Sequence, residues 1–99
     1  MYKLIYTEEA KTNIDRLSGR KKRQLKQALE RLILDPEAGK RLSGGLHGLY
    51  SYRSGDYRII YRLIHNEITV LVLAVGHRQD VYEKLTRKIR GLKGYSVNE

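Results

Sequence analysis

The chain has 99 residues, enough for one domain with one modest core and too few for two. Hydrophobic residues make up 40% of it, which excludes wholesale disorder although 31% of the residues are charged. Cysteine is absent, so disulfides, thiolate nucleophiles, iron–sulfur clusters and cysteine zinc sites are excluded. Twenty Lys and Arg against 11 Asp and Glu give a formal charge of +9, which indicates an anionic partner: nucleic acid, an acidic protein or a membrane surface.

The hydropathy pattern gives no sign of membrane insertion. The longest apolar run, residues 68–75 interrupted by Thr69, is too short to cross a bilayer. The first six residues lack the apolar segment of a signal peptide. We therefore expect a soluble, cytoplasmic protein that does not associate with a membrane.

The first part of the chain predicts a strand followed by a helical hairpin. Residues 2–6 are expected to form a short strand, and Thr7 the N-cap of a first helix. The helical pattern breaks at residues 18–19, and a second apolar stripe of helical period follows over residues 25–33. This second helix should stop before Pro36, because the residue before proline disfavours the helical conformation.

The second half of the chain changes to a period of two. Residues 37–48 contain four glycines and are expected to form a loop. Strands are predicted over residues 49–53, 57–64 and 68–75, joined by short turns that make antiparallel hairpins. The last of these strands is apolar on both faces, as suits a strand inside the sheet.

The chain ends with a predicted amphipathic helix over residues 81–92 and a flexible tail over residues 93–99. The predicted order is β-α-α-β-β-β plus this C-terminal helix. The fold class is therefore α+β, a single domain over residues 1–92 in which a helical hairpin packs on a small antiparallel sheet.

The sequence gives little evidence for a metal site, a phosphate-binding loop or a serine nucleophile. His47, His65 and His77 have no paired ligand three or four residues away and no carboxylate cluster beside them. The glycines at 44 and 45 lack the Lys-Ser/Thr of a phosphate-binding loop, and no nucleophile elbow surrounds any serine. We expect no metal and no cofactor.

Arginine and tyrosine are concentrated in the C-terminal half. Strand alternation places Arg58 and Arg62 on one face, and Tyr57 and Tyr61 on the other. A guanidinium can bind a phosphate and a tyrosine ring can stack on a base. Arg78 follows the end of the last strand, where its side chain could converge with that of Arg58. The same residues also suit an ordinary solvated face or a protein interface.

The outer face of the second helix is strongly basic. Residues 16–31 contain seven basic residues and one acid, Glu30. Such a run is often only the solvent-exposed side of an amphipathic helix. Here the charges are nearly all positive, so they repel one another unless a polyanion lies nearby.

Two segments together resemble a known family. Residues 46–61 read LHGLYSYRSGDYRIIY, in which GDYR is followed by two apolar residues and a tyrosine. After an apolar strand, GHR at residues 76–78 is followed by VY at residues 81–82. Over nearly residues 1–90 the chain resembles the RelE/ParE superfamily of type II toxins, and is most similar to the RelE-like branch.

The resemblance implies the toxin component of a type II toxin-antitoxin system. The implied activity is that of an mRNA interferase, a ribosome-dependent endonuclease that cleaves mRNA in the A site and inhibits translation. The implied partners are the ribosome, mRNA and a cognate RelB-like antitoxin, with operator DNA bound only through the toxin-antitoxin complex.

The resemblance also implies site residues. Arg58 matches the motif arginine of its strand, Arg78 the arginine after the last strand, and Tyr82 the tyrosine at the start of the C-terminal segment. Arg53 matches a further basic residue near the turn. His77 is a candidate general acid or base, because an imidazole suits proton transfer at neutral pH.

The expected reaction needs no metal. The ribose 2′-OH of the substrate attacks the adjacent phosphodiester, and Arg58 and Arg78 stabilise the charge on the phosphoryl oxygens. The residues expected to bind RNA are Arg53, Lys22, Lys26, Arg87 and Lys88.

One departure leaves other functions open. Leu49 and Ser51 stand where RelE nucleases of this pattern carry a pair of lysines. The alternatives are a toxin of the same fold that blocks DNA gyrase, as ParE-type members do, and a basic nucleic-acid-binding module without catalysis.

Overall fold

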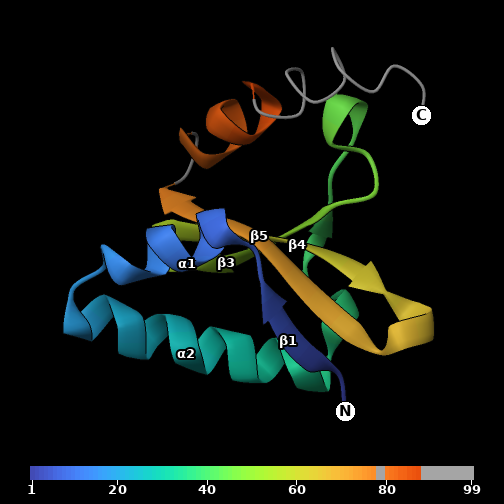
Figure 1. The fold of residues 1–99 in the computed structure, drawn as a ribbon, viewed down its shortest axis with the longest axis horizontal. Coiled ribbons are helices and arrows are strands. Elements are labelled where there is room, and N and C mark those ends of the chain that lie inside the picture. Colours follow the sequence, from blue (N-terminus) through green and yellow to red (C-terminus); the bar gives the residue numbers. More distant parts are fainter. Residues whose placement is uncertain (78–79, 88–99) are drawn as a thin grey trace.

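The structure, a computed structural model, describes residues 1–77 and 80–87 and has an α+β fold (Figure 1). In chain order the elements are β1 (Lys3–Tyr6), α1 (Glu8–Asp15), α2 (Gly19–Leu34), β2 (Lys40–Arg41), β3 (Tyr50–Ser54), β4 (Tyr57–Ile64) and β5 (Thr69–His77), and residues 80–87 are helical. Short 3-10 turns cover Pro36–Ala38, Gly44–Leu46 and His65–Glu67.

The first helix begins after its predicted N-cap, Thr7, and the hairpin turns at the predicted break at residues 18–19. The Thr7 hydroxyl accepts a hydrogen bond from the Ala10 amide at 3.1 Å, and Ser18 caps α2 by accepting from the Lys21 amide at 3.3 Å. Each cap satisfies an amide that has no partner inside its helix. Helix α2 ends at Leu34, in agreement with the predicted stop.

The five strands form one sheet in the order β1-β5-β4-β3-β2. Strands β2 to β5 are antiparallel to their neighbours, as predicted, but β1 pairs with β5 in parallel. The expectation of a purely antiparallel sheet is therefore wrong for β1. In the sequence, the two helices lie between β1 and the other strands, so no hairpin turn constrains the direction of β1.

Strand β2 is a second correction. It lies inside the stretch predicted as a loop, residues 37–48, and pairs with β3 through Lys40 opposite Ser51 and Arg41 opposite Tyr50. Two residues are too few to show a period, so the glycines around them dominated the prediction.

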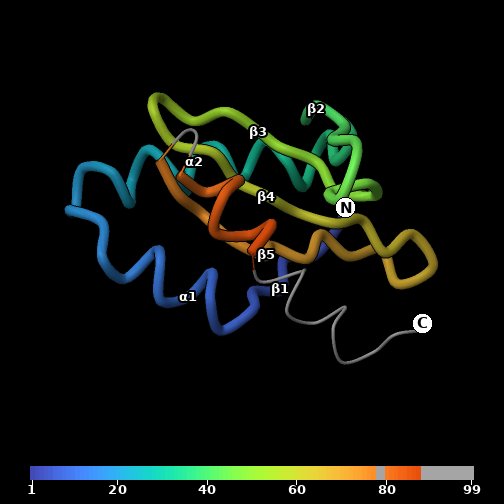
Figure 2. The backbone as a smooth tube through the Cα atoms, turned by 90° about the horizontal axis from the view of Figure 1, so that it is seen from above, coloured from blue at the N-terminus to red at the C-terminus, as the bar shows by residue number. Residues whose placement is uncertain are grey.

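The sheet has two covered faces. In Figure 1, α2 lies below the sheet and the 80–87 helix above it, and Figure 2 shows the 80–87 helix crossing over β4 and β5. We call the face toward α1 and α2 the first face and the face toward the 80–87 helix the second face. The main core, on the first face, is built from Ala10, Leu25, Ala28, Leu29, Leu32, Ile59, Tyr61, Val70, Val72 and Val75. The smaller core, on the second face, is built from Leu49, Ile60, Ala74, Val81 and Leu85.

A β-bulge in β5 determines which side chains reach each face. Ile60 pairs with Ala74 but Tyr61 pairs with Val72, which leaves Leu73 as the extra residue. Leu73 and Ala74 both pack in the smaller core, whereas β4 keeps its alternation without interruption.

The C-terminal helix is confirmed through residue 87. Its predicted continuation to residue 92 and the predicted tail over residues 93–99 lie outside the described residues. No helix in the described part of the chain has the length and apolarity that crossing a membrane requires.

Candidate functional site

Two arginines face each other across the β3–β4 hairpin. Arg53 pairs directly with Arg58, and both lie on the second face, because Arg58 also pairs with Gly76 beneath the 80–87 helix. Like charges directly opposite on neighbouring strands repel each other. Within residues 1–77 and 80–87, no ion pair joins either arginine to a carboxylate. This arginine pair therefore offers two guanidinium groups to an anion.

Tyr82 lies on the same face as the arginine pair. Its hydroxyl shares a hydrogen bond of 2.7 Å with the Ser51 hydroxyl. Ser51 precedes Arg53 by two residues, so both side chains project from the same side of β3. The structure thus brings Arg53, Arg58 and Tyr82 to one face, with Ser51 between the tyrosine and the strand.

Gly76 allows the 80–87 helix to sit close to the sheet. A Cβ atom at Gly76 would lie 2.8 Å from the Val81 Cβ, closer than real Cβ atoms approach. The glycine of the GHR sequence is therefore explained by packing: it lets the first turn of this helix, which carries Tyr82, lie against β5.

The structure does not bring His77 to the arginine pair. His77 pairs with Tyr57, and the two rings meet edge to face at 5.3 Å. Tyr57 packs against the main core and has the Lys21 ammonium 5.0 Å from its ring centre, so His77 projects from the first face. His77 and Arg58 therefore project from opposite faces of the sheet, and the catalytic role of His77 stays a prediction.

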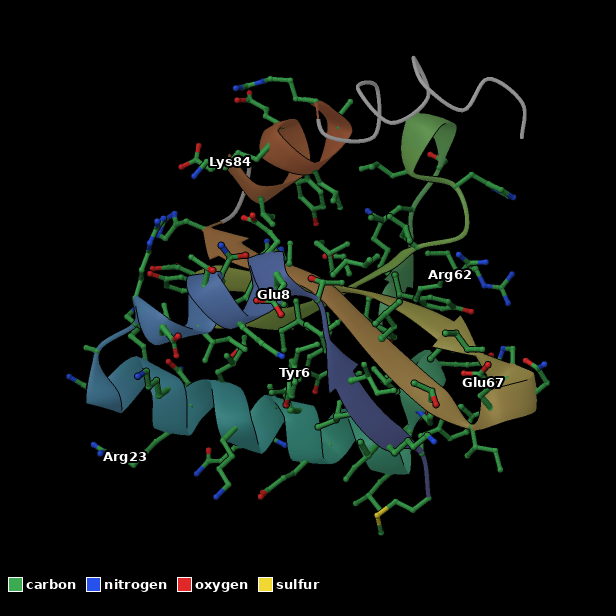
Figure 3. The ribbon with its side chains drawn as sticks, in the orientation of Figure 1. Tyr6, Glu8, Arg23, Arg62, Glu67 and Lys84 are labelled. Carbon is green, nitrogen blue, oxygen red and sulfur yellow. The ribbon has the colours of Figure 1, made fainter. Side chains whose placement is uncertain are left out.

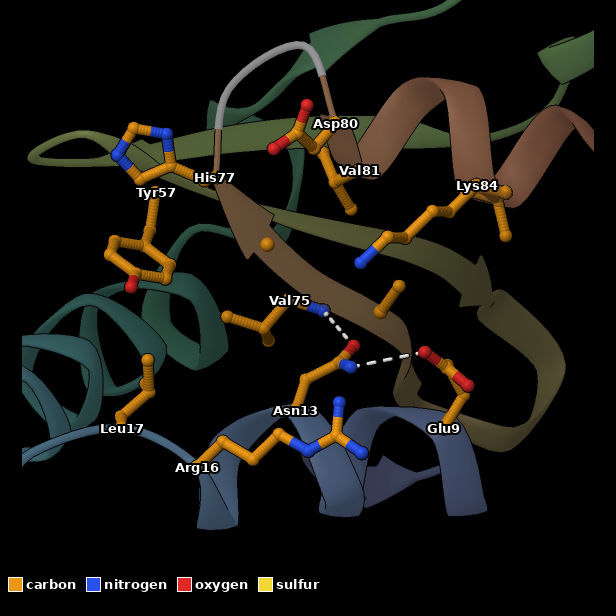
Figure 4. Close-up of a pocket in the computed structure, with 13 residues that line it drawn as sticks. Glu9, Asn13, Arg16, Leu17, Tyr57, Val75, His77, Asp80, Val81 and Lys84 are labelled. Atoms are coloured by element: carbon orange, nitrogen blue, oxygen red, sulfur yellow. Dashed lines mark hydrogen bonds between the residues drawn. The ribbon is translucent and has the colours of Figure 1, made fainter.

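His77 instead lines a cavity of about 440 Å³ between α1 and the 80–87 helix (Figure 4). The cavity lies beside the last residues of β5, beyond the end of its pairing with β1. There the Val75 amide donates to the Asn13 side-chain oxygen at 2.9 Å, and the Asn13 amide group donates to Glu9 at 3.0 Å. The other charged residues of the lining are Arg16, Asp80 and Lys84. Because the lining carries both acidic and basic side chains, this cavity attracts a polyanion less strongly than the arginine pair does.

The residues expected to bind RNA are divided between the two sides of the molecule. Lys22 and Lys26 are exposed on α2, on the first-face side, whereas Arg87 is exposed on the 80–87 helix. Figure 3 shows Arg23 on α2 and Arg62 on β4 extending from different parts of the surface. The expected residues Arg78 and Lys88 lie outside the described residues.

Two features of the second face were not predicted from the sequence. Lys40 of β2 lies opposite Ser51 and adds a cation to this face, but its strand was not predicted. Ser51 entered the prediction only as a missing lysine, and the chain carries no local signal that its hydroxyl meets Tyr82, 31 residues away.

Tyr61 is a buried tyrosine with a structural role. Burial raises the pKa of Tyr61 to about 12. Its hydroxyl donates to the Pro36 carbonyl at 2.7 Å and accepts from the Gly39 amide at 3.0 Å. These bonds hold the segment that leads into β2. In the described part of the chain, no three His, Asp or Glu side chains cluster as metal ligands would.

Comparison with known proteins now identifies the chain. Residues 4–82 match the family described as the ParE toxin of the type II toxin-antitoxin system parDE. The chain belongs to this toxin family. The predicted membership of the RelE/ParE superfamily is thereby confirmed.

The toxin is also similar to individual curated proteins. It is 44% identical to toxin RelG of Mycobacterium tuberculosis over 46 residues, which cover 46% of this chain and only 53% of RelG. It is 28% identical to the mRNA interferase toxin RelE of Escherichia coli over 92 residues, 89% of this chain and 97% of that protein.

Solved toxin structures share its fold. The RelBE2 toxin-antitoxin complex of Mycobacterium tuberculosis contains a chain with a TM-score of 0.72 and 33% identity, covering 78% of this toxin and 98% of that chain. The isolated Escherichia coli RelE toxin gives a TM-score of 0.68 and 29% identity, covering 90% of this toxin and 99% of that chain. The predicted fold class is confirmed.

Proposed function

We propose that this toxin is an mRNA interferase, a metal-independent endoribonuclease that cleaves mRNA in the ribosomal A site. The arginine pair is the observation that carries the proposal, because two guanidinium groups without a carboxylate partner in the described residues suit a phosphodiester. The similarity to Escherichia coli RelE, which is named an mRNA interferase, supports the same activity.

The proposed reaction is an internal transfer at phosphorus. The substrate 2′ oxygen bonds to the adjacent phosphorus as the bond from phosphorus to the 5′ oxygen breaks. Water accepts the 2′-OH proton and supplies a proton to the 5′ oxygen, and the products are a 2′,3′-cyclic phosphate and a 5′-OH end. Negative charge grows on the nonbridging oxygens in the transition state, so preorganised guanidinium donors accelerate the step.

Each site residue has a separate task in this proposal. Arg58, with Arg53 beside it, holds the scissile phosphate, and Tyr82 stacks on or orients the scissile nucleotide. Arg78 matches an arginine of the RelE pattern and would be a further phosphate-binding group. His77 is left out of the chemistry at the arginine pair, because its ring lies on the first face.

We further propose that this toxin binds the ribosome through charge and is neutralised by a protein. Lys22, Lys26, Arg87 and Lys88 would contact ribosomal RNA in a salt-sensitive way that does not depend on sequence. A cognate RelB-like antitoxin in the cytoplasm would inhibit the toxin, and the complex would bind operator DNA. Toxin-antitoxin complexes of similar chains from Mycobacterium tuberculosis and Escherichia coli support this partner.

Primer extension on mRNA during induction of the toxin tests the activity. We expect discrete cuts within codons of translated mRNA, and no cuts in the same RNA without ribosomes. The family match to ParE toxins favours gyrase inhibition as the second candidate. Intact transcripts together with inhibited DNA supercoiling would establish that candidate, and unchanged growth without an antitoxin would favour the non-catalytic binding module.

A further inference from the structure

We propose that Ser51 is a positioning residue that fixes the Tyr82 phenol beside the arginine pair. The proposal rests on the proposed cleavage activity and extends it to a residue with no obvious chemistry of its own. The contact that carries it is the 2.7 Å hydrogen bond between the two hydroxyl groups.

Ser51 is buried, so little water is available to replace this bond. Its residue is 6% exposed, and it is one of two buried polar residues in the described part of the chain, with Thr69. The Thr69 hydroxyl donates to the nearby Glu67 carbonyl at 2.9 Å, a local turn contact. Ser51 instead bonds to a side chain from another element. A buried hydroxyl without a partner costs free energy, so Ser51 favours the conformation in which Tyr82 meets it.

Apolar packing alone does not orient the phenol. Val81 and Leu85 hold the 80–87 helix against Ile60 and Ala74, but such contacts have no preferred direction. Tyr82 is only half-buried, so its ring could turn while these residues stay in place. The hydrogen bond to Ser51 removes that freedom, because it requires one hydroxyl position.

The fixed position is useful for the proposed reaction. Ser51 and Arg53 are two residues apart on one side of β3, a separation of about 7 Å along an antiparallel strand. The hydrogen bond therefore holds the phenol on the same face of β3 as Arg53, two residues along the strand from the arginine pair. Preorganising such a group lowers the entropic cost of reaching the transition state.

A double-mutant cycle tests the inference. The variants are Ser51→Ala, Tyr82→Phe and the double variant, assayed by single-turnover cleavage at saturating ribosomes. We expect Ser51→Ala to lower the cleavage rate about 5- to 20-fold with unchanged ribosome affinity. In the Tyr82→Phe background the same change should have no further effect beyond about twofold, because the bond is already lost.

Thr69→Val is the matched control, since it also removes a buried hydroxyl but lies far along β5 from Tyr82. It should lower thermal stability while leaving cleavage unchanged. Hydrogen exchange of the amides of residues 81–87, measured on the toxin alone, should accelerate in Ser51→Ala and Tyr82→Phe but not in Thr69→Val.

The outcomes distinguish a failure of this inference about Ser51 from a failure of the proposed function. Additive losses in the double variant, or unchanged cleavage and exchange in Ser51→Ala, would overturn the role of Ser51. A parent toxin that cuts no mRNA on ribosomes would instead overturn the proposed activity, and the exchange measurement would still report whether Ser51 holds Tyr82.

Discussion

Replacing Arg58 with glutamine should separate catalysis from stability. The substitution removes the guanidinium that the proposal places on the scissile phosphate but keeps a side chain of similar shape. Loss of one preorganised donor to a developing oxyanion typically costs about 100- to 1000-fold in rate, or about 3–4 kcal/mol. We expect a loss of this size in single-turnover cleavage of mRNA on purified ribosomes.

The same substitution should not destabilise the free toxin. Arg58 and Arg53 are directly opposite on paired strands, and like charges in that arrangement cost about 0.2–1 kcal/mol. Removing one charge relieves this repulsion, so the melting temperature should stay the same or rise by a few degrees. Most substitutions lower stability, which makes the sign of this change informative.

Arg62→Gln is the matched control for Arg58→Gln. Arg62 lies on the same strand and the same face, but it pairs with Leu71 and is remote from Arg53. We expect Arg62→Gln to change cleavage by less than about threefold, since it contacts no proposed substrate group. The reasoning is refuted if Arg58→Gln cuts as fast as the parent, or if both arginine variants lose activity equally.

Further predictions concern Tyr61, His77 and the basic helix. Tyr61→Phe should lower the free energy of unfolding by about 1–3 kcal/mol at pH 7 in urea titrations, because two backbone groups lose their hydrogen bond to the phenol. Burial raises the folded-state pKa of Tyr61 to about 12 while the unfolded phenol ionises near 10. Its stabilising contribution is therefore complete below pH 10, and up to about 2–3 kcal/mol is lost as pH rises toward 12, a decline that the Phe variant should lack. His77→Ala should cut mRNA within about threefold of the parent rate, and a loss above about 100-fold would return His77 to the chemistry. Replacing Lys22 and Lys26 together with alanine should weaken ribosome binding equally for all mRNA sequences and reduce the salt dependence by about two counterions, measured by cosedimentation over a salt series.

Local signals in the chain were sufficient to predict most of the fold. Thr7 and Ser18 stand where the helices begin, because their hydroxyls satisfy the free amides of a first turn. The alternation in residues 57–64 correctly assigned Arg58 and Arg62 to one face and Tyr61 to the other. These features depend on neighbours within a few residues, so a single sequence contains them.

Features set by distant pairing could not be predicted. The parallel direction of β1 depends on how the helical hairpin returns the chain, and the two-residue strand β2 exists only because β3 pairs with it. The contact between Ser51 and Tyr82 likewise joins a strand to a helix across 31 residues. A spacing in the sequence cannot report such contacts, because tertiary packing creates them.

The orientation of His77 has a single structural cause. Val70 and Val72 project from the first face, so plain alternation along β5 would send residue 77 to the second face, beside Arg58. The bulge at Leu73 inserts one residue and reverses this order, so that Val75 and His77 project from the first face and Gly76 from the second. The same reversal puts a residue without a side chain beneath Val81, where any Cβ atom would be too close. One extra residue in β5 therefore both seats the helix that carries Tyr82 and removes the histidine from the arginine face. In the proposed mRNA interferase, the groups that this face offers for cleavage are therefore guanidinium and phenol groups, and the imidazole of His77 lies on the other face.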